Sequence, residues 1–578
     1  MKKIYRVLGL SVFLFALSCD LEKDLDNPNE VSVDTADPTL IMNGIQADFG
    51  QWFSLAGGQN IAGTNDFANS RSVAELVRMQ AMTGGDQYER AFTPQDLNAI
   101  WSGAYQDVLI NIEAMLPLAE EDNLTTHIGV AKIIKAYIFM TLVDLFGDVP
   151  ADEALKGGEG IINPSTTPGS AVYDMALTLL NEARTELAKP AAEAGPALTR
   201  DIFYGGNRTR WITLANTLEF KAWLNISALP ARATEAGAAL SALLTANDLI
   251  DTDAEEFTYK YGTADVPTRS RHPLYLDYYR AQSGSAGGYI GNYFLKQVFN
   301  GTGVQDPRWR YYFYRQAGSI LRMLAFDGES VPCVNTAGKP IGKPAHFSND
   351  HPFCVFDPGF FGRDHGDNDG GPPDSPVITT VGVYPAAGRI DNQIADANDP
   401  VGGQFVASTQ QGQGGNGRGI EPIFMSFFIN FMRAEAILRG VLPGDAAAAR
   451  AQMISGIDKS ITRVQAFGSS LGQTTTLATP ALTYTTKVGQ IYDLATDKLD
   501  VVGTEFYKAL WGNPIEAYNL LRRTSSPRTI QPTRAINGGV FFRSLLYPAN
   551  FVNLNNSTAQ KPVNDVRVFW DGNPDNLF

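Results

Sequence analysis

Cysteine and histidine are scarce in this sequence of 578 residues. There are three cysteines (Cys19, Cys333 and Cys354) and five histidines (His127, His272, His346, His351 and His365). The sequence contains no CxxC pair and no tight group of histidines and cysteines. We therefore do not expect a zinc site or a catalytic thiol.

Basic residues are fewer than acidic ones, and long apolar runs are absent. Lys and Arg number 46 against 61 Asp and Glu, a net charge of −15, so the sequence offers no basic face for nucleic acid. No apolar run approaches the ~18 residues of a membrane-spanning helix. The strings GxSxG, HExxH and the P-loop are absent, and acids are too common to indicate a glycosidase pair. We therefore expect a protein without enzyme activity.

The first residues have the pattern of a lipoprotein signal. Three basic residues precede the apolar stretch Val7–Leu17, and Ala-Leu-Ser-Cys19 follows at the cleavage point. Leucine stands at −2, whereas −3 is more usual, and an ordinary signal peptide is the alternative. We predict a signal peptide over 1–18 and lipidation of Cys19. Each buried CH₂ of an acyl chain contributes about 0.8 kcal/mol to membrane anchoring.

Residues 19–38 are acidic and poor in apolar groups, as expected of a solvated tether. Acids directly after the lipidated cysteine resemble the surface-export signal of Bacteroidota lipoproteins, which indicates the outer face of the outer membrane. In that oxidising compartment, Cys333 and Cys354 are expected to form a disulfide. A metal site or a reactive thiol is the alternative.

Helical periodicity dominates both ends of the sequence. Between 97 and 112, apolar residues including Ile100, Trp101 and Tyr105 recur at spacings of three and one, which gives one wide apolar face. We predict helices at 97–112, 125–146, 170–188, 210–228, 421–440, 444–467 and 500–521.

The middle of the chain reads differently. Residues 255–420 are rich in Gly, Pro, Asp and aromatics, with short strands expected at 318–325 and 377–384. A loop-rich region of this length is usually functional. We predict one domain over 39–578, with a helical scaffold mainly at 39–250 and 421–530, the loop-rich region 255–420 and C-terminal loops at 531–578.

Several short motifs follow one another from the tether to the C-terminal loops, over some 530 residues. They are Leu25–Pro28, Gly129–Pro150 (ending Phe-Gly-Asp-Val-Pro), Trp211–Leu224, Asp306-Pro307-Arg308, Met432–Ala436, Trp511, Glu516–Pro527, Arg543 and Tyr547-Pro548. In this order they resemble the SusD/RagB family of nutrient-binding outer-membrane lipoproteins.

The resemblance implies a mostly α fold of about eight helices arranged as a tetratricopeptide-like solenoid of helix pairs, with a loop-rich ligand face. It also implies a partner, a SusC-like TonB-dependent transporter over which the lipoprotein sits as a lid. The implied function is capture of a nutrient, most often a glycan. A peptide-binding lid is the first alternative, and a surface glycan hydrolase or an adhesin is the next.

Aromatic and polar residues outside the scaffold helices are the candidate ligand contacts, because aromatic planes suit the apolar faces of sugar rings. For each of them, packing in the core is the alternative role. The candidates are Asn65, Asp66, Arg71, Tyr88, Tyr275, Tyr278, Tyr279, Tyr289 and Trp309, with Tyr293 in the same cluster.

The segment 362–374 concentrates possible oxygen ligands between glycines. Asp364, Asp367 and Asp369 are the candidates for a structural Ca²⁺, with His365 and Asp374 close by. The EF-hand glycine and distal glutamate are absent, and a solvated Asp/Gly turn is the alternative. No other cofactor is expected.

Overall fold

The computed structural model describes most of the chain. The described residues are 36–57, 72–83, 92–264, 270–279, 288–315, 342–356, 359–367, 378–391, 413–477 and 479–573. Within these ranges no helix is both long and apolar enough to cross a bilayer. The predicted signal peptide, Cys19 and nearly all of the tether lie outside them.

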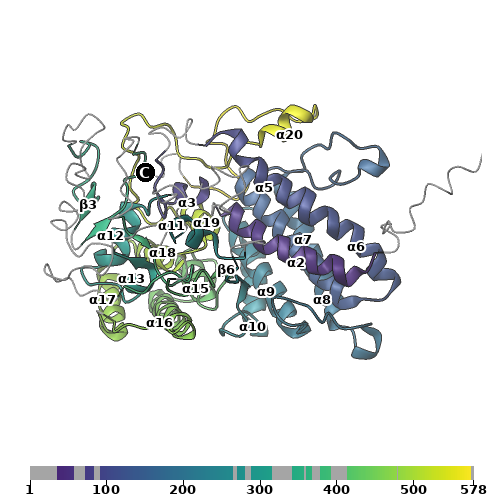
Figure 1. The fold of residues 1–578 in the computed structure, drawn as a ribbon, viewed down its shortest axis with the longest axis horizontal. Coiled ribbons are helices and arrows are strands. Elements are labelled where there is room, and N and C mark those ends of the chain that lie inside the picture. Colours follow the sequence, from purple (N-terminus) through teal and green to yellow (C-terminus); the bar gives the residue numbers. More distant parts are fainter. Residues whose placement is uncertain are drawn as a thin grey trace, which may run out of the picture.

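The first half of the chain is a group of helices that pack side by side (Figure 1). Its helices are α2 (Pro38–Ala56), α5 (Asn98–Ser102), a π-helix (Gly103–Leu109), α6 (Ile110–Glu121), α7 (Thr125–Phe146), α8 (Gly169–Ala188), α9 (Arg208–Ile226) and α10 (Ala233–Ala246). The short α3 (Ser72–Leu76) lies apart from this group and packs on α19 (Pro514–Thr524). Single 3₁₀ turns stand at Pro94–Leu97, Gly157–Glu159 and Ala191–Glu193. Neighbours in sequence are also neighbours in space: α7 packs on α6 and α8, and α9 on α8 and α10.

Helix α7 is the central element of this group. Nearly all its side chains are buried, as expected of a helix that is apolar on every side. Gly129 lets α8 approach, since a Cβ there would lie 2.5 Å from Leu187 Cγ. Gly147, with φ of 80°, ends the helix where the sequence predicted.

The second group of helices comes from the C-terminal part of the chain. It contains α15 (Phe428–Leu438), α16 (Ala446–Ser470), α17 (Ala481–Leu494), α18 (Lys498–Ala509) and α19 (Pro514–Thr524), followed by the short α20 (Ala549–Leu554). Helix α15 packs on α16 and α18, and α17 packs on both α16 and α18.

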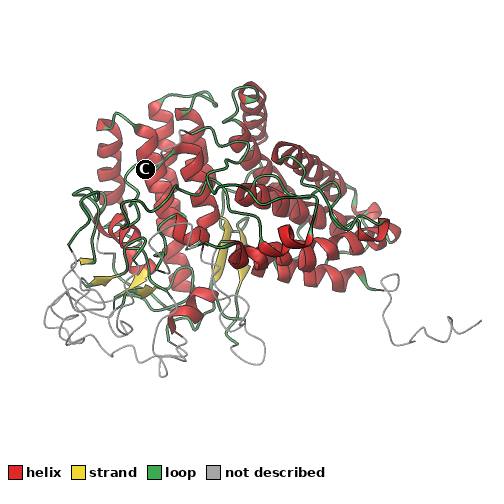
Figure 2. Ribbon diagram, turned by 90° about the horizontal axis from the view of Figure 1, so that it is seen from above, coloured by secondary structure: helices red, strands yellow, loops and turns green. Residues whose placement is uncertain are grey.

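The middle segment supplies short helices and three two-stranded antiparallel sheets. The helices are α11 (Pro273–Tyr279), α12 (Asn292–Asn300) and α13 (Trp309–Tyr312). The sheets pair β1 (Phe257–Lys260) with β6 (Ile420–Phe424), β2 (Phe313–Tyr314) with β5 (Thr380–Val381), and β3 (Val355–Phe356) with β4 (Phe360–Phe361). Figure 2 shows these strands gathered along one side of the helical body.

The mostly α fold predicted from the sequence is confirmed, and there are more helices than the eight or so expected. The solenoid arrangement in detail stays a prediction. Helix 421–440 was predicted to begin too early, because 420–424 pairs with β1 as strand β6. The predicted helix 500–521 is two helices, because Gly512 turns the chain with φ of 98° and Asn513 caps α19.

The strand predictions were partly right. Of the described part of the predicted strand 377–384, residues 378–384, only Thr380–Val381 forms a strand, where it pairs with β2. The strand predicted at 318–325 lies outside the described residues.

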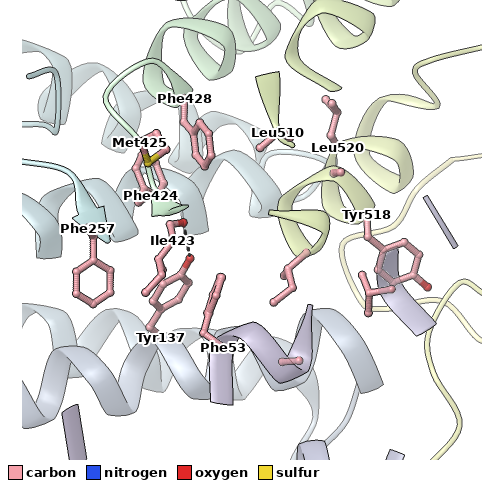
Figure 3. Packing of buried hydrophobic residues seen from close by; sticks show 14 of the residues in the cluster. Phe53, Tyr137, Phe257, Ile423, Phe424, Met425, Phe428, Leu510, Tyr518 and Leu520 are labelled. Carbon is pink, nitrogen blue, oxygen red and sulfur yellow. Dashed lines mark hydrogen bonds between the residues drawn. The ribbon is translucent and has the colours of Figure 1, made fainter. Parts of the chain in front are cut away.

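The core joins the two helix groups through the β1–β6 sheet (Figure 3). The Tyr137 ring of α7 lies 5.6 Å from the Phe53 ring of α2 and 6.5 Å from Phe257 of β1, measured between centroids. Its hydroxyl donates to the Ile423 carbonyl of β6 at 3.5 Å. Residues far apart in sequence therefore share one apolar core.

A buried polar network crosses this core at Asp144 of α7. Its carboxylate accepts hydrogen bonds from Lys221 Nζ at 3.0 Å, Asn519 Nδ2 at 2.7 Å, Trp570 Nε1 at 3.1 Å and the Tyr173 hydroxyl. The network ties α7, α8, α9, α19 and the C-terminal segment together. A buried carboxylate is tolerated only when it is paired and hydrogen-bonded in this way.

Arg523 of α19 extends the polar contacts to α15. Its guanidinium donates to both carboxylate oxygens of Glu435 at 2.7 and 2.9 Å, to Glu516 at 3.2 Å and to Asn225 Oδ1 at 2.8 Å. Burial opposes ionisation of Glu435, yet Arg523 and Arg439 together hold its pKa below the usual value.

A third buried cluster centres on Arg308. Its guanidinium pairs with Asp306 at 2.6 and 2.9 Å and donates to Ser460 Oγ at 3.0 Å. Glu505 lies 3.7 Å from the same guanidinium and accepts from Lys508 at 2.7 Å. This cluster fixes the segment before α13 to α16 and α18.

Stability is expected to fall in acid because His272 is buried in its neutral form. Its Nδ1 accepts from the Leu274 amide at 3.1 Å, and burial lowers its pKa from 6.5 to about 3. Between those values the unfolded chain binds a proton that the folded protein does not. As the pH falls from 6.5 toward 3, His272 should therefore lower the free energy of unfolding by about 1.4 kcal/mol per pH unit.

Urea denaturation at pH 7, 5.5 and 4.5 measures this slope. The variant His272→Asn removes the titrating ring and should show a shallower dependence than the parent over the same range. Parallel slopes for the two proteins would contradict the expectation.

Candidate functional site

Tyr289 lies where three separate segments of the chain, its own included, meet. The Ala81 amide donates to the Tyr289 carbonyl at 2.9 Å, and the Arg363 amide donates to the Ile290 carbonyl at 3.1 Å. Gly291 must lack a Cβ here, because one would lie 2.2 Å from the Arg78 carbonyl oxygen. The backbone therefore holds Tyr289 rigidly between segments 72–83 and 359–367.

The Tyr289 side chain is half-buried and is fixed by its neighbours. The Arg363 guanidinium lies 4.8 Å from the ring centroid, and the Phe361 ring meets it edge-on at 6.5 Å. Arg363 in turn pairs with Asp367 at 3.0 Å, and Arg534 pairs with the other oxygen of the same carboxylate. This Tyr289 platform combines an aromatic ring with charged hydrogen-bonding groups.

Asp364 and His365 lie behind the platform, in the interior. Asp364 accepts from Asn292 Nδ2 at 3.1 Å, Gln531 Nε2 at 3.0 Å and the Cys354 amide at 2.7 Å. Burial raises the Asp364 pKa and lowers that of His365. Both side chains are buried, so neither is accessible to a ligand.

These contacts bear on the predicted calcium ligands. Asp364 is committed to three donors, and the two arginines beside Asp367 disfavour a cation there. Among the described residues no group of three His, Cys, Asp or Glu side chains could hold a metal. Asp369 lies outside the described residues, so a calcium site stays a prediction. The contacts of Asp364 and Asp367 argue against it.

Five of the candidate aromatics belong to the core. Tyr275 and Tyr279 stack at 4.7 Å, the Tyr279 hydroxyl donates to the Val381 carbonyl at 2.7 Å, and Arg315 lies 4.5 Å from the Trp309 ring. All five rings, those of Tyr275, Tyr278, Tyr279, Tyr293 and Trp309, are at most 2% exposed. A ring can stack on a ligand only through an accessible face. The burial of these five rings therefore favours a packing role, and ligand contact by them stays a prediction.

The remaining candidates fall outside the described residues. These are Asn65, Asp66, Arg71, Tyr88, Cys333 and Asp369, together with Cys19. Cys354 is disulfide-bonded. Its predicted pairing with Cys333 stays a prediction.

Two hollows lie elsewhere on the described surface. One, of about 470 Å³, lies between α12 and α18 and includes Lys296 and Thr504 but no aromatic residue. The other, of about 480 Å³, lies beside β1–β6, where the aromatic rings of Tyr261 and Phe467 are themselves buried. Neither presents an accessible ring, so the Tyr289 platform remains the candidate ligand site.

The fold matches those of solved structures of known family. A SusD-like protein of Bacteroidetes aligns with a TM-score of 0.63 and 16% identity, over 93% of this chain and 100% of its own. A SusD/RagB family protein from Bacteroides thetaiotaomicron aligns with 0.62 and 15%, over 93% and 100%. A family model described as "Starch-binding associating with outer membrane" matches residues 40–326. The chain belongs to the SusD-like family. The resemblance drawn from the sequence motifs is thereby confirmed.

Two further similar structures have a ligand in their names. A chitin-binding SusD homologue from Flavobacterium johnsoniae has a TM-score of 0.59 and 16% identity, over 93% of this chain and 98% of its own. A structure named a chitin-binding protein has 0.60 and 19%, over 92% and 100%. At these identities the likeness shows the shared SusD-like fold alone. No curated protein matches the sequence.

The SusD-like motifs of this chain hold its scaffold together. Asp144, Lys221 and Glu435 belong to three different motifs, Glu516 and Arg523 share a fourth, and all five take part in the buried networks described above. Sequence reasoning identified these residues by resemblance but did not assign them this role. The sequence of α19, PIEAYNLLRRT, has no local pattern that marks its charged residues as buried.

Proposed function

We propose that this SusD-like chain is a lipid-anchored substrate-binding protein of the outer membrane. It captures an oligosaccharide at the cell surface and delivers it to a SusC-like TonB-dependent transporter. The observation that carries the proposal is the family match, whose description names starch binding and association with the outer membrane. The chitin-binding names of two similar structures support a glycan ligand.

The Tyr289 platform supplies the chemistry for such a ligand. The apolar C–H face of a sugar ring stacks on the tyrosine, while Arg363, Arg534 and Asp367 reach hydroxyl groups. Asn65, Asp66, Arg71 and Tyr88 are proposed to complete the site. Binding requires no bond cleavage, and contacts shared with the transporter would leave the isolated protein with modest affinity.

Tyr289→Ala is expected to weaken oligosaccharide binding about tenfold or more, because it removes the stacking ring at the centre of the site. Titration calorimetry with neutral hexasaccharides measures the change. Tyr259→Ala is the matched control, since Tyr259 is also half-buried but lies on β1. Equal affinities for the two variants would count against this site.

Cys19→Ala is expected to release the protein from membranes, because it removes the sulfur that carries the acyl chains. Fractionation of cells that produce the parent or the variant measures the shift from the membrane pellet to the soluble fraction. Retention of the variant on membranes would refute lipid anchoring.

A further inference from the structure

Trp101 is unlike every other tryptophan of this protein. The sequence has seven, and six of them are at most 8% exposed: Trp52, Trp211, Trp223, Trp309, Trp511 and Trp570. Trp101, near the end of α5, is only half-buried. It stands two residues before the start of the π-helix at Gly103, a distortion that occurs often at functional sites.

The Trp101 ring forms one wall of a hollow of about 270 Å³ between α5 and α20. Figure 1 shows α20 at the top of the molecule with α5 below it, and the two elements are in contact. The Phe551 ring lies 4.6 Å from Trp101 at an angle of 31°, and the Phe146 ring supports the indole edge-on at 5.3 Å. The aromatic wall is therefore fixed in place before any ligand arrives.

None of the described residues that line this hollow is charged. Amide side chains surround the rings at Asn98, Gln106, Asn550 and Asn555. The Asn98 Oδ1 accepts from the Asn550 backbone at 2.9 Å, and Asn555 Nδ2 donates to the Pro164 carbonyl at 2.8 Å. Within the described chain the side-chain amides of Gln106 and Asn550 make no hydrogen bond, and both residues are exposed. Each keeps a donor and an acceptor for a ligand.

Two large apolar side chains flank the opening. Ile162 and Leu554 are each 80% exposed, although the chain buries most residues of their type. Aromatic planes, apolar rims and unpaired amides without charge match a neutral sugar, whose hydroxyl groups pair with amides and whose C–H faces pack on rings.

We propose that this Trp101 hollow is a second binding subsite, for a neutral sugar residue and separate from the Tyr289 platform. The inference rests on the proposed glycan-binding function. A docked protein is disfavoured because a stable protein interface needs roughly 800 Å² on each partner. A hollow of about 270 Å³ is instead on the scale of one or two sugar rings.

Tryptophan emission tests this subsite directly, because the other six indoles are shielded. Titration of the protein with chitohexaose and with maltohexaose should change the emission saturably for at least one of them. The change should vanish in Trp101→Phe, which keeps a ring but loses the reporter, and should persist in Tyr289→Ala.

Two leucine variants give a matched pair. Leu554→Ala should raise the dissociation constant measured by emission about tenfold. Leu494→Ala should leave it unchanged, because Leu494 is 87% exposed but stands at the end of α17. Calorimetric binding with no Trp101-dependent emission change and no effect of Leu554→Ala would overturn the subsite and leave the proposed function standing. Absence of calorimetric binding would overturn both.

Discussion

Replacing Arg523 with methionine is expected to lower the free energy of unfolding by about 3–5 kcal/mol. The guanidinium is buried and pairs with Glu435 at 2.7 Å and Glu516 at 3.2 Å. Methionine would leave two buried carboxylates without their shared cation. Urea denaturation of the variant and the parent at pH 7 measures the loss.

Arg450→Met is the matched control for this prediction. Arg450 pairs with Asp493 at 2.9 Å, but the two side chains are 36% and 55% exposed. Solvent screens such a pair, so the variant should lose no more than about 1 kcal/mol. Similar losses for the two arginine variants would contradict the role assigned to the buried network.

Trp511→Ala is the second large effect, expected to cost about 3–5 kcal/mol of stability. The indole follows α18, stacks on Phe294 of α12 at 5.0 Å and donates to the Tyr384 carbonyl at 3.1 Å. It therefore fastens the middle segment to the C-terminal helices. Truncation removes the stacking contacts and leaves both a cavity and an unpaired carbonyl.

Trp511→Phe separates these contributions. Phenylalanine keeps an aromatic ring and loses the hydrogen bond, so the variant should lose much less stability than Trp511→Ala. The same urea unfolding experiment applies to both proteins. A loss of less than about 1 kcal/mol for the alanine variant would show that the middle segment is not held in this way.

Local patterns predicted the helices whose limits depend on nearby residues. Helix α7 begins and ends as predicted, because its apolar run stops at Gly147 and a proline follows at position 150. The prediction of helix at the position of strand β6 is wrong because its partner, β1, lies some 160 residues earlier, and no local pattern shows that pairing. The break before α19 was missed although Gly512 and Pro514 are adjacent to it.

The site was predictable in part. Tyr289 is one of several aromatic residues that the sequence offers as ligand contacts. In the structure its ring is half-buried beside charged side chains, whereas the rings of Tyr275 and Tyr279 are packed in the core. Burial of a ring depends on segments distant in sequence, so composition could not separate these cases. Trp101 was assigned to the apolar face of its helix, and its partly open ring became visible only beside Phe551.

The central claim, capture of an oligosaccharide without cleavage, is tested most directly by titration calorimetry of the protein beginning at Asp20. The panel is a set of neutral oligosaccharides and peptides, each recovered afterwards and examined for hydrolysis. The account predicts saturable binding of an oligosaccharide that is recovered intact. Binding of peptides alone, hydrolysis of the ligand, or no binding of any oligosaccharide would contradict it.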